Sequence, residues 1–351
     1  MELTIDLQSH WCVAFVLRFK YEKYMELILP ASRYLGYIKK YWFPGGLICV
    51  CILTLADNSG ILVDSGRWLK GHHGPDLVIV FIFLLSGLAL SPDQLLAGLM
   101  DVKGILLAAV NIFLAAPLLA VLFSLFPMNT GMIIGLFLVA VMPSTLSSGV
   151  VMTAAAGGNA AHAMVTTIVA NCLSVFTIPY ALSALLMAIG ESAAVTIEKG
   201  AIMLKIAVLV ILPLAAGMLL KHFFSSRYDR IAPKINMINQ GLILFIVWIA
   251  FSQTRGMLMD SGMVVGGIII MAFLYHGLLL MSAWSLIRIS RRGRGHRESI
   301  LFMGAQKTLP LSIILQVSLF PQYATALLVC VLHHIIHLIM DGYLVERMKA
   351  D

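Results

Sequence analysis

The sequence predicts an all-α polytopic membrane protein with ten membrane-spanning helices, arranged as two inverted repeats of five. Of the 351 residues, 60% are hydrophobic and only 12% are charged, and the mean hydropathy is +0.95. Soluble domains carry about 25% charged residues. The few charges are concentrated in short segments, which leaves runs long enough to cross a hydrocarbon core of about 30 Å as helices. The runs are continuously apolar rather than alternating, which excludes a β-barrel.

Residues 1–38 differ from the rest, because they mix basic residues and tyrosines with an apolar stretch, Trp11–Leu17, that is too short to span. Three interpretations stay open: an amphipathic helix on the cytoplasmic leaflet, a poorly structured extension, or an upstream start with the real start of translation at Met25. Glu2 and Asp6 stand where a signal peptide would carry positive charge. The ten spans expected next cover residues 42–57, 75–91, 104–126, 130–156, 160–189, 200–221, 235–253, 262–289, 299–320 and 322–345.

Lysine and arginine are unevenly distributed between the two sides of this arrangement. One side carries Lys39, Lys40, Lys103, Lys221, Arg227, Arg230, Lys234, Arg288, Arg291, Arg292, Arg294, Arg297, Arg347 and Lys349. The other side carries Arg67, Lys70, Lys199 and Arg255. Cytoplasmic loops are the ones enriched in these residues. We therefore expect a multi-pass protein of the cell's inner (plasma) membrane with both termini in the cytoplasm.

The spans divide into two sets of five, residues 42–189 and 200–345. Because each set has an odd number of spans, the second set enters the membrane from the opposite side, as in the inverted repeats of many secondary transporters. The fourth and ninth spans hold equivalent places in the two sets. Both are interrupted near their middle by proline within a cluster of hydrogen-bonding residues, at 142–149 and at 304–310.

Broken helices inside a membrane indicate an ion or solute site. Proline removes a backbone donor, and the freed carbonyls are tolerated only inside protein or beside a wet cavity. Half-helix ends carry partial charges, so two breaks that meet can bind an anion, a cation or both. The candidate binding side chains are Ser144, Thr145, Ser147, Ser148, Gln306 and Thr308. Thr167 and Asn171 of the fifth span are expected to line the same cavity, although hydrogen bonds between helices also explain them.

Lys307 is a cation near the middle of the ninth span. Inserting such a charge costs about 2.5–3.5 kcal/mol, which makes the residue a functional candidate. Three roles stay open: a fixed positive charge for an anionic solute, a substitute for a bound sodium ion, or a proton carrier. The alternative is a side chain that extends to the cytoplasmic interface, a reach of up to about 15 Å along the helix.

The tenth span contains His333, His334 and His337, which spacings of three and four place on one helix face. The order His-His-Ile-Ile-His lacks the glutamate of the His-Glu-x-x-His zinc motif. We expect His334 and His337 to face the transport pathway or to pack through hydrogen bonds, and we predict no metal or catalytic residue. The alternative function is an intramembrane metal-dependent enzyme, or a regulatory membrane protein, that uses these histidines.

The stretch from Met142 to Ser148, followed by Gly157-Gly158-Asn159, resembles the fourth-helix signature of the bile acid:sodium symporter family. Further motifs are similar to its SBF-like branch, the solute carrier family 10, member 7 type. They are Ser86-Gly87-Leu88, Lys307-Thr308-Leu309, and His334 with His337. The resemblance covers residues 39–348. It implies a panel domain over 42–91 and 200–253, a core domain over 104–189 and 262–345, and spans 4 and 9 that cross at their breaks. In the bile acid transporters, this crossing binds two sodium ions.

The sequence departs from the sodium-coupled pattern at three places. Ser148 and Gly149 stand where those carriers have Ser-Asn, and Phe302 stands where they have a glutamate. Gln306 matches their glutamine, but Lys307 replaces a neutral polar residue. Loss of an anionic ligand and gain of a cation both weaken sodium binding.

The expected function is therefore secondary transport of a small anionic organic solute by alternating access, without a cofactor and with sodium or a proton as candidate coupling ion. The basic residues lie in loops beside the spans, so the net charge of +7 does not indicate nucleic acid. The expected partners are the solute and the lipid bilayer. No phosphate-binding loop is present, which argues against ATP-driven transport by this chain.

Overall fold

The structure is a computed structural model that describes residues 42–90, 98, 100–190, 198–223, 225–259 and 264–350. The extension predicted over residues 1–38 lies outside the described residues. Residues Leu47–Asp351 form one compact unit, and the packing described below lies within it.

Every regular element in the described ranges is helical, as the sequence predicts. In chain order the elements are Trp42–Leu55, α2 (Ile61–Gly71), α3 (Gly74–Ala89), α5 (Val102–Val110), η1 (Asn111–Ala115), α6 (Ala116–Ser124), α7 (Thr130–Val141), α8 (Ser148–Ala155), α9 (Ala160–Ala188), α10 (Lys199–Ile206), η3 (Ala207–Ile211), α11 (Leu212–Phe223), α12 (Ser225–Met259), α13 (Val265–Ile289), α14 (Arg297–Ala305), α15 (Leu309–Leu319) and α16 (Ala324–Ala350). The elements η1 and η3 are single π-helical turns inside longer helices.

Seven helical runs in the described chain are long and apolar enough to cross a membrane. They are Val102–Ser124, Ala160–Ala188, Lys199–Lys221, Lys234–Gly256, Val265–Ile289, Arg297–Leu319 and Ala324–Lys349. The pair α2 and α3, bent by 78°, raises the number to eight if it is one span. Two shorter apolar helices, Trp42–Leu55 and Thr130–Val141, coincide with the first span and with half of the fourth. The chain is thus a helical membrane protein, and ten spans remain a prediction.

The connection expected between the first two spans contains a helix, α2, that the sequence analysis missed. The carboxylate of Asp57 starts it by accepting hydrogen bonds from the backbone N–H groups of Gly60 and Val63, both at 3.1 Å. Gly66 of α2 lies against Ser252 of α12, where a Cβ atom would overlap the serine side chain. The helix is short and polar on one face, which hid it within a loop-like stretch.

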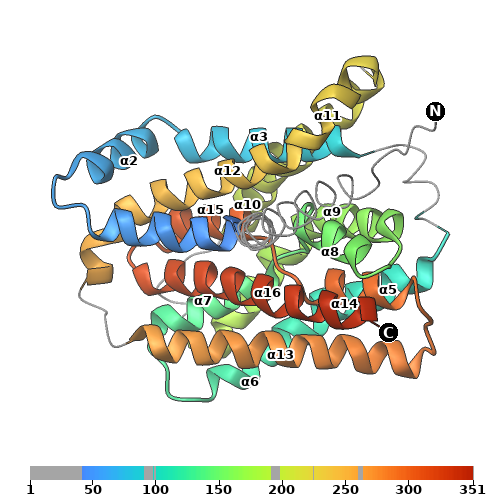
Figure 1. The fold of residues 1–351 in the computed structure, drawn as a ribbon. Coiled ribbons are helices and arrows are strands. Elements are labelled where there is room, and N and C mark those ends of the chain that lie inside the picture. The colour runs from blue at the N-terminus through green and yellow to red at the C-terminus, as the bar shows by residue number, and fades with distance from the viewer. Residues whose placement is uncertain are drawn as a thin grey trace, which may run out of the picture. The chain divides into compact units, whose positions relative to one another are not determined.

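Helices α3, α11 and α12 pack together as one group (Figure 1). The backbones of α3 and α11 touch at two glycines: a Cβ atom on Gly87 would lie 3.0 Å from the Cα atom of Gly217, and nearer still to a carbonyl of α11. Small residues permit such close approach of helices in membranes. Ser86 joins α3 to α12, because its hydroxyl accepts a hydrogen bond of 2.9 Å from Asn239 Nδ2.

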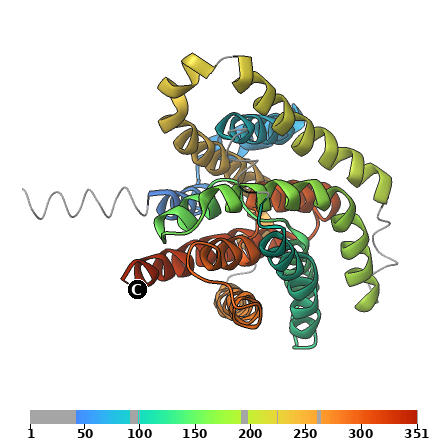
Figure 2. The same cartoon turned by 90° about the vertical axis from the view of Figure 1, so that its right-hand side faces the viewer.

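A second group contains α5 to α9 and α13 to α16. Helix α16 packs along α7 and α13, and α14 packs against α5, α8, α9 and α13 (Figures 1 and 2). Tyr275 of α13 is fully buried there, and its hydroxyl donates to the carbonyl of Ala116 at 2.9 Å. This packing brings the two interrupted helices together.

Candidate functional site

The two helix breaks predicted near Pro143 and Pro310 are present and in contact. Helix α7 ends at Val141 and α8 begins at Ser148, while α14 ends at Ala305 and α15 begins at Leu309. The backbone N–H of Thr308, in the second break, donates to the carbonyl of Pro143, in the first, at 2.9 Å. Pro310 sits in the first turn of α15, where a helix makes no use of the missing N–H.

Lys307 lies in the second break with only 2% of its surface exposed. Its Nζ atom donates to the carbonyls of Ile112 and Ala140, each at 2.9 Å, and of Met142 at 3.0 Å. A lysine ammonium has three donors, so all of them are used. The interpretation as a side chain that reaches the interface is wrong. The partners of Nζ are therefore backbone carbonyls and not the hydroxyls of the first break.

Each of the three carbonyls is available for a structural reason. Ala140 and Met142 stand at the C-terminal end of α7, where a helix leaves its carbonyls without partners. In the π-turn η1, the N–H of Ala116 donates to the carbonyl five residues earlier, at Asn111. The next residue, Pro117, has no N–H, so the carbonyl of Ile112 has no partner from it within the helix. We call these three carbonyls the carbonyl cradle.

Gln306, fully buried, joins the two breaks through its side chain. Its Oε1 atom accepts from the hydroxyls of Thr145 at 2.6 Å and of Ser148 at 3.1 Å. The Thr145 hydroxyl oxygen also accepts from the N–H of Gly149 at 3.1 Å. A Cβ atom on Gly149 would lie 3.0 Å from Gln306 Oε1. Glycine at this position therefore leaves room for the amide.

The remaining sequence candidates fall into two groups. The carbonyl of Ser144 accepts from the Thr167 hydroxyl at 3.2 Å and, weakly, from Asn171 Nδ2 at 3.5 Å. Thr167 and Asn171 therefore hold the backbone of the first break. Ser147 is partly exposed and stands at the N-cap of α8 without a side-chain capping hydrogen bond. The other candidates of the two breaks are buried together.

His334 and His337 are buried beside each other, with His334 Nδ1 and His337 Nε2 2.8 Å apart. The sequence analysis missed their neighbours. Asp341, one turn beyond His337, accepts from Gln306 Nε2 at 2.8 Å, and it lies 2.9 Å from His276 Nε2 of α13. Asp341 is an ionisable residue within an apolar span, which is the signal that singled out Lys307.

Asn111 of the third span, which the sequence also offers for the cavity or for hydrogen bonds between helices, makes such bonds: its Nδ2 atom donates to the carbonyls of Gly304 at 3.0 Å and Leu279 at 3.2 Å. It ties the π-turn to the end of α14. Over the described ranges, no group of three His, Cys, Asp or Glu side chains is arranged to hold a metal ion.

A polar cluster outside the spans joins the loop before α5 to the loop between α13 and α14 in the second group. Asp101 caps α5 by accepting from the N–H of Gly104 at 3.0 Å, and it contacts Arg292 Nη1 at 3.0 Å and His296 Nδ1 at 2.7 Å. Burial raises the pKa of Asp101, but the Gly104 hydrogen bond and the charges of Arg292, His162 and His296 outweigh it, so its pKa lies below the ordinary value. The ionised carboxylate therefore fastens these loops.

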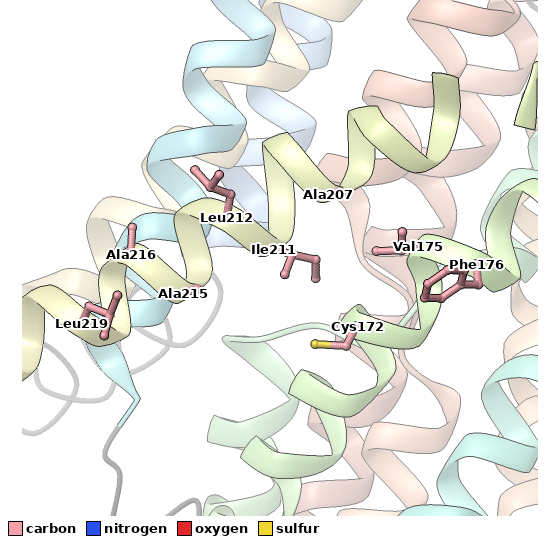
Figure 3. A pocket seen from close by; sticks show the side chains of 9 residues that line it. All are labelled: Cys172, Val175, Phe176, Ala207, Ile211, Leu212, Ala215, Ala216 and Leu219. Atoms are coloured by element: carbon pink, nitrogen blue, oxygen red, sulfur yellow. The ribbon is translucent and has the colours of Figure 1, made fainter. Parts of the chain in front are cut away.

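An apolar pocket of about 560 Å³ lies between α9 and the η3–α11 segment (Figure 3). Figure 3 shows the side chains of Cys172, Val175 and Phe176 on α9 and those of Ile211 and Leu212 on the other wall. Cys172 directly follows Asn171, whose amide reaches the first break. The pocket thus lies next to the helix segment that supports the breaks, and its lining suits an apolar group.

Comparison with known proteins agrees with this architecture. A chloroplast protein of Arabidopsis thaliana named probable sodium/metabolite cotransporter BASS4 is 28% identical over 280 residues, which is 76% of this chain and 64% of that protein. A Xenopus laevis protein named sodium/bile acid cotransporter 7-B is 26% identical over 329 residues, covering 89% of this chain and 93% of that protein. Sodium/bile acid cotransporter 7 of Danio rerio is 29% identical over 228 residues, or 62% and 64% of the two chains.

These relatives favour transport over the alternative of an enzyme built on the histidines. Residues 41–350 match the SBF-like CPA transporter family, and this range includes every residue that the structure describes. With its apolar helices and its paired helix breaks, this chain belongs to the SBF-like CPA transporter family and is a membrane transporter.

Proposed function

We propose that the chain carries a small organic anion across the inner membrane by alternating access around the two helix breaks. The observation that carries the proposal is Lys307, a buried cation held where the breaks meet. A fixed positive charge and the N-terminal ends of α8 and α15 both favour an anion at this place. The relatives named as bile acid and metabolite cotransporters support an organic solute.

The proposed solute has an apolar part as well as its charge. Binding pockets for small molecules measure about 300–1,000 Å³ and are lined mainly by apolar side chains with a few polar groups. The pocket beside Cys172 has this volume and an apolar lining, and it is open at the protein surface, where Phe176 and Leu212 are exposed. We assign the apolar part of the solute to it and the anionic group to the breaks.

The proposed movement is that of two rigid groups. The spans around α3, α11 and α12 are assigned to the panel, and the group from α5 to α9 and α13 to α16 to the core. The tight contact of Gly87 with Gly217 supports the panel as one body. The cluster at Asp101 joins two loops of the core and supports the core as the other body. The proposal includes ten spans in two inverted repeats and both termini in the cytoplasm.

Lys307 is proposed to take the place of a coupling sodium ion. Sodium binds oxygen atoms as a compact positive charge, and an ammonium is a compact positive charge with three donors. In this chain it binds three backbone oxygens that the breaks and Pro117 leave free. A sodium ion within the carbonyl cradle would have to displace Lys307, so transport is expected to be indifferent to sodium.

The test is uptake of labelled taurocholate and pyruvate into proteoliposomes, with external sodium replaced by potassium or choline. Wild-type protein is expected to give saturable uptake that does not change with the cation. Lys307→Ala should abolish uptake or make it depend on sodium. The matched control is Lys205→Ala, since Lys205 also lies in an apolar helix but bonds the Ser318 hydroxyl at 2.7 Å, away from the breaks. A steep loss of wild-type uptake without sodium would refute the substitution.

A further inference from the structure

Four imidazoles and one carboxylate gather beside the second break, where α13 faces α16. They are His276, His333, His334, His337 and Asp341, here called the histidine–aspartate cluster. None of them is more than 3% exposed. The ring centres of His276, His333 and His337 form a triangle with sides of 5.5, 5.6 and 5.6 Å. Such a concentration of ionisable groups in a membrane interior points to a function.

The hydrogen bonds of this cluster are incomplete. His276 Nδ1, His333 Nε2 and His337 Nδ1 are buried and have no hydrogen-bond partner. His337 Nδ1 stands 3.7 Å from Asp341 Oδ2, which is too long for a hydrogen bond but close enough for a small movement to make one. A neutral imidazole has one nitrogen that can accept a proton, so unpartnered nitrogens beside a carboxylate offer a place for one.

The charges that face the cluster are few. Lys307 approaches from the second break, and the phenol of Tyr275 packs against His333 with 5.8 Å between ring centres. Helices α7, α8 and α15, which also pack on α16, have no ionisable side chain, and α12 has none from residue 235 to 254. Asp341 and Lys307 are therefore the main charged side chains around the cluster, and one added proton changes the net charge of this interior by one unit.

We propose that the histidine–aspartate cluster binds one exchangeable proton and that Gln306 transmits its presence to the helix breaks. The proton adds to His337 Nδ1, facing Asp341, and can pass along that contact to the carboxylate. It leaves by the reverse step, so no other reactant is needed. The coupling part of this inference rests on the proposed transport function, and it names the proton as the coupling ion.

Gln306 can transmit the change because its two ends contact different partners. With Asp341 ionised, the amide nitrogen donates to the carboxylate and the amide oxygen accepts from Thr145 and Ser148. A protonated carboxyl becomes a donor, which favours the amide oxygen as its partner. The amide then turns by half a rotation and presents its N–H groups to the two hydroxyls. The hydroxyls must change from donors to acceptors, which rearranges the first break.

The experiment counts protons on purified full-length protein in phosphatidylcholine liposomes, with no solute present. Acidification from about pH 8 to about pH 5 spans the range in which imidazoles titrate. Wild-type protein is expected to take up one proton more than Asp341→Asn. Asp64→Asn, which removes a carboxylate that is 77% exposed, should match the wild type. Equal uptake by wild type and Asp341→Asn would overturn the proposal.

A second variant covers the case that Asp341→Asn does not fold. His337→Gln leaves the carboxylate in place and is expected to shift the midpoint of the extra proton by at least about one pH unit, the scale of a close charge partner. An unchanged midpoint would contradict the assignment. If the wild type binds one added Zn²⁺ and His337→Gln does not, the cluster is a metal site and the proton assignment is wrong. Because the count uses no solute, its failure is distinct from a failure of taurocholate or pyruvate uptake.

Discussion

Lys307 satisfies its charge with backbone carbonyls, so its removal leaves a cavity lined by oxygen atoms. Each hydrogen bond between a charged group and a neutral one contributes about 1.5–3 kcal/mol, and an orphaned buried acceptor costs about 1–3 kcal/mol. Lys307→Ala is therefore expected to lower the midpoint of thermal denaturation in choline. Sodium should restore part of it, by up to about 2.7 kcal/mol at 100 times its Kd. Thermal scans in the two salts measure this.

The control for this prediction is the wild-type protein, which should show the same midpoint in both salts. Lys205→Ala should behave in the same way, because Lys205 lies outside the carbonyl cradle. Sodium stabilisation of the wild type and Lys307→Ala by equal amounts would place the sodium site elsewhere.

Asp101 supports a second residue-level prediction, which concerns pH. Its pKa is lowered in the folded protein, so its contribution is complete above the unfolded pKa of about 3.9 and is lost as the pH falls through the lower folded value. Asp101→Asn keeps a capping side chain for α5 but loses the ion pairs, at a cost of about 0.2–1 kcal/mol. Wild type should be the more stable at about pH 6 and equal to the variant at about pH 2. A difference that persists in acid would assign the effect to the cap.

At the scale of elements, the two π-turns provide a matched pair. Each is followed after one residue by proline, at Pro117 after η1 and at Pro213 after η3. Removing a proline from a helix interior restores a hydrogen bond, and alanine stabilises such a site by about 3 kcal/mol. Pro117→Ala also gives the carbonyl of Ile112 a competing partner. We expect Pro117→Ala to be less stable than Pro213→Ala by about 1.5–3 kcal/mol.

This difference should disappear when both substitutions are compared in a Lys307→Ala background, because Lys307 is then absent and no longer competes for the carbonyl of Ile112. Denaturation midpoints of the four variants measure the coupling. Equal stability of Pro117→Ala and Pro213→Ala in the wild-type background would contradict the idea that η1 and Pro117 keep the carbonyl of Ile112 free for Lys307.

Sequence patterns predicted the helices and both breaks, because proline and apolar length act locally. They did not predict α2, whose start depends on the hydrogen bonds that Asp57 accepts within a polar stretch. The residues that contact the site could not be predicted either, because they are distant in the sequence. The carbonyl of Ile112 is 195 residues from Lys307, and the imidazole of His276 is 65 residues from Asp341. Asp341 could have been predicted by the criterion applied to Lys307, an ionisable residue within an apolar span. A backbone carbonyl without a partner cannot be recognised in the sequence.

At the scale of the whole molecule, the inverted repeat predicts the location of its ends. Five spans in each half place the connection at residues 190–199 on the opposite side of the membrane from the C-terminus. Alkaline phosphatase should therefore be active when it is fused within that connection, and green fluorescent protein should fluoresce after Asp351. The excess of lysine and arginine in the other loops supports this orientation. If the two reporters showed that residues 190–199 and the C-terminus lie on the same side of the membrane, the inverted repeat would be contradicted.

The carbonyl cradle has an electrical consequence. A sodium ion that accompanies an anion is released with it on the far side, so its charge offsets that of the anion. The ammonium of Lys307 is covalently attached and returns with the carrier. The current per cycle then depends only on the solute and on any proton that travels with it. A monovalent anion alone would gain or lose about 2.3 kcal/mol per 100 mV of membrane voltage, and an anion with one proton would be insensitive to it. A voltage-clamped bilayer would thus reveal the stoichiometry that a flux measurement leaves hidden.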